Sequence, residues 1–130
     1  MKEIIKAIKR RFDDEGVFKA ALTGGLFLGS APFEVDSTEP YCAVVPGVEP
    51  FWTFENNLAT YTIRMWLVSS ARSAKEIMDL EEKMKDCFDE APLVIEGAHL
   101  LRFWRVSSTL ERVDNRWELA VEYNCQIQEE

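Results

Sequence analysis

Residues 58–92, LATYTIRMWLVSSARSAKEIMDLEEKMKDCFDEAP, decide the fold. In the first part of this stretch apolar and polar side chains alternate, which predicts a β-strand with one buried face. The predicted buried set is Tyr61, Ile63, Met65 and Leu67, and the opposite set is Thr60, Thr62, Arg64 and Trp66.

The period changes to that of a helix in the second part of the stretch. Apolar residues now recur at steps of three and four, and Pro92 ends the run. Ser73 and Glu76 stand three positions apart before it, which predicts a capping box at the start of the helix. The predicted buried stripe is Ile77, Leu80, Met84 and Phe88, with Cys87 beside it.

Upstream, a first helix is expected over about residues 2–22, bent or split at Gly16. Its apolar stripe is Ile4, Ile5, Ile8 and Phe12. Lysines and arginines cover most of the remaining surface. We interpret them as a solvated face rather than a membrane-binding one, because the acidic run 13–15 follows directly.

The rest of the chain predicts strands and two irregular connections. The strands are expected at 26–29, 41–47, 98–113 and 116–127, and the connections at 30–40 and 48–57. Asp114 and Asn115 suit a two-residue hairpin turn, because both tolerate positive φ. The order is α-β-β-β-α-β-β. We therefore predict an α+β fold, with a mainly antiparallel sheet and two helices packed on one face, in a single domain of residues 1–130.

The charge balance is acidic, with 15 basic and 23 acidic residues and a formal net charge of −8. Affinity for nucleic acid comes largely from neutralising phosphates, so this chain is a poor candidate for gripping DNA or RNA. No apolar run approaches the roughly 20 residues that span a bilayer. The charged N-terminus does not have the apolar core of a secretory signal, so we expect no membrane partner.

Cysteine spacing excludes two kinds of site. Cys42, Cys87 and Cys125 are odd in number and far apart, which suits neither a disulfide framework nor a zinc site. Each stands where an apolar residue would fit. We predict small buried side chains in a reducing compartment, the cytoplasm by default.

Other candidate chemistry is weak. Gly24, Gly25 and Gly29 suggest a phosphate loop, but no Lys-Ser/Thr pair follows them and the helix precedes the strand. Gly24 or Gly25 is therefore interpreted as the residue that ends the helix. His99 is the single histidine and is interpreted as structural. We predict no enzyme, no metal and no cofactor.

The second face of the predicted sheet is the informative anomaly. Its polar members are Thr60, Thr62, Arg64, Arg102, Glu118 and Glu122, and its large apolar members are Trp66, Trp104 and Val106. Aromatics among arginines and carboxylates are typical of an assembly surface. The alternative is a loop folded over them or a second core layer. Phe51, Trp52 and Phe54, in the second connection, pose the same question.

Together these stretches resemble the small tail terminator, or tail completion, proteins of long non-contractile phage tails and their prophage relatives. The matching pieces are the basic helix ending in LTGG (22–25), the short strand and SAP turn (26–32), the strand that starts PYCAVV (40–45), and the strand–helix unit from residue 60 with its two-stranded finish. The resemblance covers nearly the whole chain and rests on pattern and element order.

The resemblance implies a sheet related to that of tail-tube subunits and a structural role. Six copies would form a ring that caps the finished tail tube and presents the surface that joins the head. The implied partners are other copies of the chain, the tail-tube protein and a head-completion or connector protein, while DNA passes through without specific binding. The implied location is the virion tail, with the host cytoplasm during assembly.

Two groups of residues gain roles from this resemblance. Arg64, Trp66, Arg102, Trp104, Phe51, Trp52 and Phe54 would be subunit, tube or connector contacts. The acidic loop with Glu34, Asp36 and Glu39 would line the lumen or a ring end that DNA slides past.

Two other classes stay open. One is a small dimeric α+β barrel enzyme of the cofactor-free monooxygenase type, with His99 and the tryptophans lining a pocket. It fits less well, because three strands in a row separate the helices here. The other is a domain that binds a small molecule or peptide, for which the sequence gives no positive sign.

Overall fold

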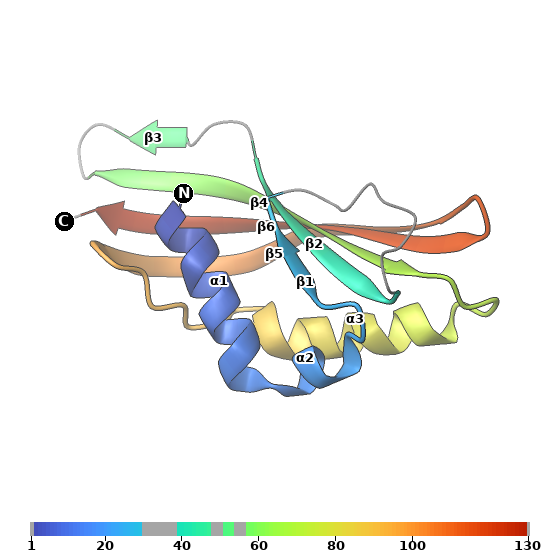
Figure 1. The fold of residues 1–130 in the computed structure, drawn as a ribbon. Helices are drawn as coiled ribbons and strands as arrows, with labels where there is room; N and C mark the ends of the chain where they lie inside the picture. The colour runs from blue at the N-terminus through green and yellow to red at the C-terminus, as the bar shows by residue number, and fades with distance from the viewer. Residues whose placement is uncertain (1, 30–38, 48–50, 54–56, 130) are drawn as a thin grey trace.

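The structure, a computed structural model, describes residues 2–29, 39–47 and 57–129, and the backbone of 51–53 (Figure 1). Its elements are α1 (Lys2–Glu15), α2 (Val17–Ala21), β1 (Leu26–Leu28), β2 (Tyr41–Pro46), β3 (Phe51–Thr53), β4 (Leu58–Ser69), α3 (Lys75–Phe88), β5 (Ala98–Val113) and β6 (Arg116–Glu129).

The strands form one sheet in the order β1-β2-β4-β6-β5, and β3 pairs with the start of β4. Only the β1–β2 pair is parallel among the described strands. All the helices lie on one side of this sheet (Figure 1). The α+β prediction is confirmed, with a mainly antiparallel sheet and helices on one face.

The first helix is split, as Gly16 suggested. Gly16 has φ +81°, a left-handed value that breaks the helical path between α1 and α2. Gly25, at φ +84°, closes the turn after α2 by donating its N–H to the carbonyl of Leu22 at 3.1 Å. The glycine stretch therefore ends a helix and starts β1, as predicted.

The core lies between the helices and the inner face of the sheet. Tyr61, Ile63, Met65 and Leu67 of β4 are all buried, as their alternation predicted. They meet the buried stripes of α1 and α3, which comprise Ile4, Ala7, Ile8, Phe12, Ile77, Leu80, Met84, Cys87 and Phe88.

Two local predictions are wrong. The connection 48–57 is not wholly irregular, because Phe51–Thr53 forms a short strand against β4. The capping box does not form either. Ser73 Oγ accepts the N–H of Lys75 at 3.0 Å, but Glu76 turns away and accepts the hydroxyl of Ser69 at 2.6 Å. Because Ser69 is fully buried, its hydroxyl must find a hydrogen-bond partner within the protein, and Glu76 supplies it instead of completing the capping box.

The long hairpin closes the sheet at one edge. Asp114 and Asn115 adopt φ of 46° and 66°, which confirms the two-residue turn. β6 runs two residues further than predicted, to Glu129. In the described part of the chain, no helix is long and apolar enough to cross a membrane.

Candidate assembly surface

The sheet face away from the helices carries most of the predicted assembly residues. On it, Arg64 of β4 faces Glu122 of β6, with 3.4 Å between Nε and Oε1. Thr62 donates its hydroxyl to Asn124 Oδ1 at 3.2 Å in the next row. This outer face is therefore a ladder of paired polar groups, which any partner would have to match.

The two tryptophans of this face do not form one cluster. Trp66 is paired with Ala120 of β6, and Trp104 is paired with Asn124, four residues further along that strand. They lie on strands to either side of β6, about 13 Å apart along its direction. Both are half-buried, so each offers a separate apolar contact.

Arg102 is held in place beside Trp104. Its guanidinium binds both carboxylate oxygens of Glu90, with contacts of 2.6 and 3.2 Å, and lies 4.9 Å from the centre of the Trp104 ring. The hydrogen bonds from Arg102 lower the pKa of the Glu90 carboxyl. Arg102 and Trp104 thus form one pre-ordered unit, which costs less entropy to bury than free side chains.

Val106 does not join the outer face as the alternation predicted. Two β-bulges interrupt the β5–β6 ladder, between Leu100 and Arg102 and between Arg105 and Ser107. Each bulge leaves one residue, Leu101 or Val106, outside the ladder. The second bulge moves the odd-numbered residues onto the outer face, where Ser107 pairs with Glu122.

The free edge of β5 is a surface that the sequence analysis missed. β5 is a 16-residue strand that ends the sheet, and its far edge pairs with no described strand. Four of its apolar residues are exposed, namely Leu101 (49%), Val106 (48%), Leu110 (40%) and Val113 (37%). The two bulges cannot be predicted from the alternation of residue types. The length of the predicted strand, with a single helix before it, could have indicated that part of this strand is left uncovered.

A groove of about 240 Å³ runs between this strand and α3. Met78 of α3, 56% exposed, stands on one wall and Leu110 on the other, with Leu119 also lining it. Edge strands that expose apolar side chains and free backbone groups readily pair with another chain. This edge is therefore the strongest candidate contact in the described structure.

The hairpin end is anchored rather than free. Trp117 donates its indole N–H to the carbonyl of Arg72 at 3.3 Å, and Arg112 donates to the carbonyl of Ala71 at 3.2 Å. The Arg112 guanidinium also stacks over the Trp117 ring, 5.0 Å from its centre. These contacts fix the β5 edge relative to the β4–α3 loop.

One end of the outer face is buried. Tyr41, Ala43 and Val68 point away from the helices, yet all three are buried. Glu39 lies there too, largely buried and ion-paired with Arg116 at 3.2 Å. This end of the outer face is therefore buried, and Glu39 has a partner within the chain.

Several predicted residues cannot be placed. Glu34, Asp36 and Phe54 lie outside the described residues. Phe51 and Trp52 are described by backbone alone, in register with Thr60 and Ala59 of β4.

The cysteines lie in the core, whereas His99 lies at the surface. Cys42, Cys87 and Cys125 are all buried and free. Burial raises the pKa of both Cys87 and Cys125 to about 12, so these thiols are protonated and poor nucleophiles at neutral pH. No group of three or more His, Cys, Asp and Glu in the described part could hold a metal ion. His99 is exposed at the start of β5, paired in register with Gln128.

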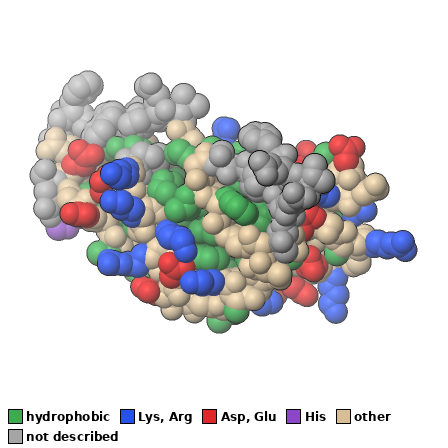
Figure 2. All heavy atoms as spheres, in the orientation of Figure 1, with side chains coloured by type: hydrophobic (Ala, Val, Ile, Leu, Met, Phe, Trp, Pro, Cys, Tyr) green, Lys and Arg blue, Asp and Glu red, His purple; other side chains and the backbone are tan. Residues whose placement is uncertain are grey.

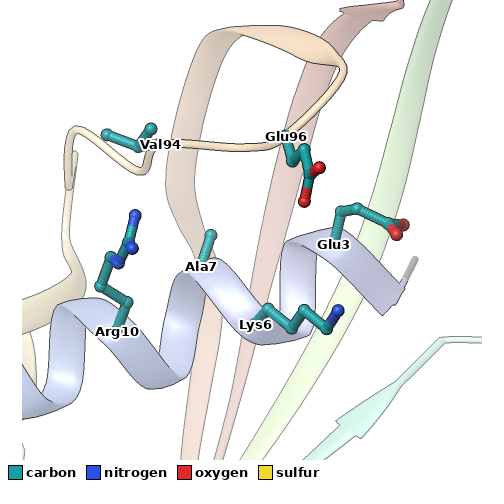
Figure 3. A pocket seen from close by; sticks show the side chains of 6 residues that line it. All are labelled: Glu3, Lys6, Ala7, Arg10, Val94 and Glu96. Atoms are coloured by element: carbon teal, nitrogen blue, oxygen red, sulfur yellow. The ribbon is translucent and has the colours of Figure 1, made fainter.

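A charged groove of about 430 Å³ lies between α1 and the segment before β5 (Figure 3). Lys6 and Arg10 stand on its α1 side, and Val94, 72% exposed, stands across from Arg10. Glu3 and Glu96 border its other end. Both signs of charge line it, so it does not suit one small anion or cation.

Comparisons with known proteins show the fold. No protein-family model matches the chain, and no curated protein sequence is significantly similar to it. A chain in the virion of a native gene transfer agent particle is similar in structure, with a TM-score of 0.77 and 13% identity, over 93% of this chain and 91% of that one. A second solved chain, known by a sequence identifier alone, has a TM-score of 0.67 at 13% identity, over 98% and 94% of the two chains.

Proposed function

We propose that this chain is a structural protein of a virion, and that it caps the completed tail tube as a closed ring of six copies. The ring would present the surface that joins the head. The observation that carries this proposal is the end-to-end structural likeness to a chain of a gene transfer agent virion. The resemblance to tail terminators, found independently in the sequence, narrows the role to tail completion.

The shape of the sheet suits assembly into a ring. A ring requires a heterologous contact, in which two different surfaces of the chain meet. The exposed β5 edge supplies one such surface. The opposite edge of the sheet is β1, where Leu28 is 41% exposed, and it supplies the other. We propose that these two edges meet between neighbouring copies.

The outer face then gains its role. We propose that Arg64, Trp66 and the Arg102–Trp104 unit contact the tail-tube protein or a connector protein. Two separated aromatic contacts, set among paired polar groups, suit a surface that binds one partner specifically.

DNA would pass through the ring without binding to it. A net charge of −8 is unfavourable for holding a polyanion. Glu34 and Asp36 remain the proposed acidic lining of the bore. Glu39 is proposed with them, and its ion pair with Arg116 would offset part of its charge. No catalytic activity or cofactor belongs to this role, and the proposed location is the virion tail after assembly in the host cytoplasm.

Deleting the gene for this chain from a particle-producing strain tests the role directly. Electron microscopy should show filled heads without tails and tails of uncontrolled length. Supplying the chain from a plasmid should restore joined particles. Normal joined particles in the deletion strain would contradict the proposal.

A further inference from the structure

We propose that the outer face of α1 in one copy binds the outer face of α3 in a second copy, through two complementary rows of charge. The inference rests on the proposed self-assembly, and it specifies which helices meet.

The first row lies on α1, away from the sheet. It consists of Lys2, Lys6, Arg10 and Asp13, all exposed. Their spacing of four, four and three residues keeps them on one side of the helix, opposite the buried stripe that includes Ile4 and Ile8. Figure 2 shows basic side chains gathered over α1.

The second row lies on α3, again away from the sheet. It consists of Lys75, Asp79, Glu82 and Asp86, all exposed. Their spacing is four, three and four residues, opposite the buried stripe that includes Leu80 and Met84. Each row extends over 11 residue steps, about 16 Å of helix.

The two rows match in sign only when the helices run antiparallel. Lys2 then meets Asp86, Lys6 meets Glu82, Arg10 meets Asp79, and Asp13 meets Lys75. No position is more than one residue out of step, so four opposite-charge pairs form at once. A parallel match instead places like charges together at both ends, because Lys2 meets Lys75 and Asp13 meets Asp86.

One pair of residues beside the rows has complementary charges in the same arrangement. Glu3 borders the groove beside Lys6 and Arg10 (Figure 3), and Lys83 lies beside Asp79 at a groove on the other helix. By helical geometry, antiparallel docking brings Glu3 and Lys83 to the same flank at neighbouring levels. That adds a fifth pair of opposite charges, whereas Asp14 and Glu76, further along the same flank, carry like charges.

Most of these groups have no ion pair within the described part of their own chain. Of the eight residues in the two rows, Asp13 alone is ion-paired in the described structure, with Lys9 at 2.7 Å and Lys19 at 2.9 Å. Two α3 rows would repel each other, and two antiparallel α1 rows would place Lys6 against Arg10. The partner that matches each row is therefore the other helix of a second copy.

Charge reversal in the full-length chain tests this contact. One variant carries K6E and R10E, and a second carries D79K and E82K. By sedimentation velocity at low ionic strength, each variant alone should self-associate roughly tenfold more weakly than the wild type, or less. The wild-type association should also weaken with salt. A control with R72E, which reverses a charge outside both rows, should behave as the wild type.

Mixing the two variants is the decisive step. In an equimolar mixture each reversed row finds a complementary row on the other variant, so association should return. Carrying all four substitutions in one chain should restore it as well. If both variants associate as the wild type does, or if the mixture stays dissociated, the α1–α3 contact is wrong.

The outcomes separate this contact from the ring proposal. Restored assemblies of two copies would support the charge rows and contradict the ring. If every charge-reversed variant still formed rings of six, the ring proposal would be supported and the α1–α3 contact would be overturned. A wild-type chain that stays monomeric at low salt and high concentration would also overturn the charge rows, while tail capping would still be tested by the gene deletion.

Discussion

The hydroxyl group of Tyr123 donates a hydrogen bond to Oδ1 of Asp89, with 2.6 Å between the two oxygens. Tyr123 is fully buried in the middle of β6, and Asp89 directly follows the last residue of α3. Phe103 of β5 stacks on the Tyr123 ring, with 4.8 Å between centroids. The contact therefore ties the end of the helix to the two strands whose far edge we propose as an assembly surface.

Replacing Tyr123 by Phe should lower the free energy of unfolding by about 1 kcal/mol, because it removes this hydrogen bond and keeps the ring. Urea denaturation would measure the change. In a double-mutant cycle with D89A, the two substitutions should be coupled by a similar amount. Additive effects would show that the hydroxyl and the carboxylate do not stabilise each other.

Alkaline pH should destabilise the fold. The ordinary pKa of a thiol here is 9.0, and burial raises it to about 12 for Cys87 and Cys125. Between these values the unfolded chain loses thiol protons that the folded chain keeps, so the free energy of unfolding falls as pH rises from about 9 towards 12. Urea titrations at pH 8 and pH 10 should show the loss, and C125A should reduce it. A flat profile would contradict the raised pKa values.

Substituting the exposed β5 edge should separate assembly from folding. Val106 and Leu110 are exposed, so V106K and L110K should change the free energy of unfolding by no more than about 0.5 kcal/mol. Both should nevertheless reduce the fraction of chain in rings, because a lysine on an edge strand blocks pairing. Val17 on α2 is 57% exposed, and V17K is the matched control. Unchanged ring formation in V106K and L110K would rule out the edge.

Gly16 should resist replacement for a backbone reason. A Cβ at this position would meet no atom within 4 Å, but φ is +81°. G16A should therefore cost about 1 kcal/mol of unfolding free energy through strain alone. G16N should cost less, since asparagine tolerates this conformation better. Equal losses in both variants would point to packing instead.

Elements with a regular period were predictable from the sequence. The alternation in β4 and β6 and the three- and four-residue steps of α3 come from burial of one face, which the side chains themselves record. The Asp114–Asn115 turn was predictable because few residue types accept positive φ.

Features that depend on tertiary contacts were not predictable. Glu76 has the spacing of a capping residue, but it turns to Ser69, which chain folding buries. The bulges at Leu101 and Val106 shift the register without changing the alternation of residue types. As a result Val106 was expected on the face of Trp66 and Trp104, and the exposed apolar residues at the free edge of β5 were overlooked.

Native mass spectrometry of the wild-type chain, over a range of protein concentrations, tests the central claim most directly. The account predicts a complex of six copies whose population rises with concentration. A stable dimer that persists at every concentration would contradict it, because a two-fold pair cannot close into a ring around a tail tube.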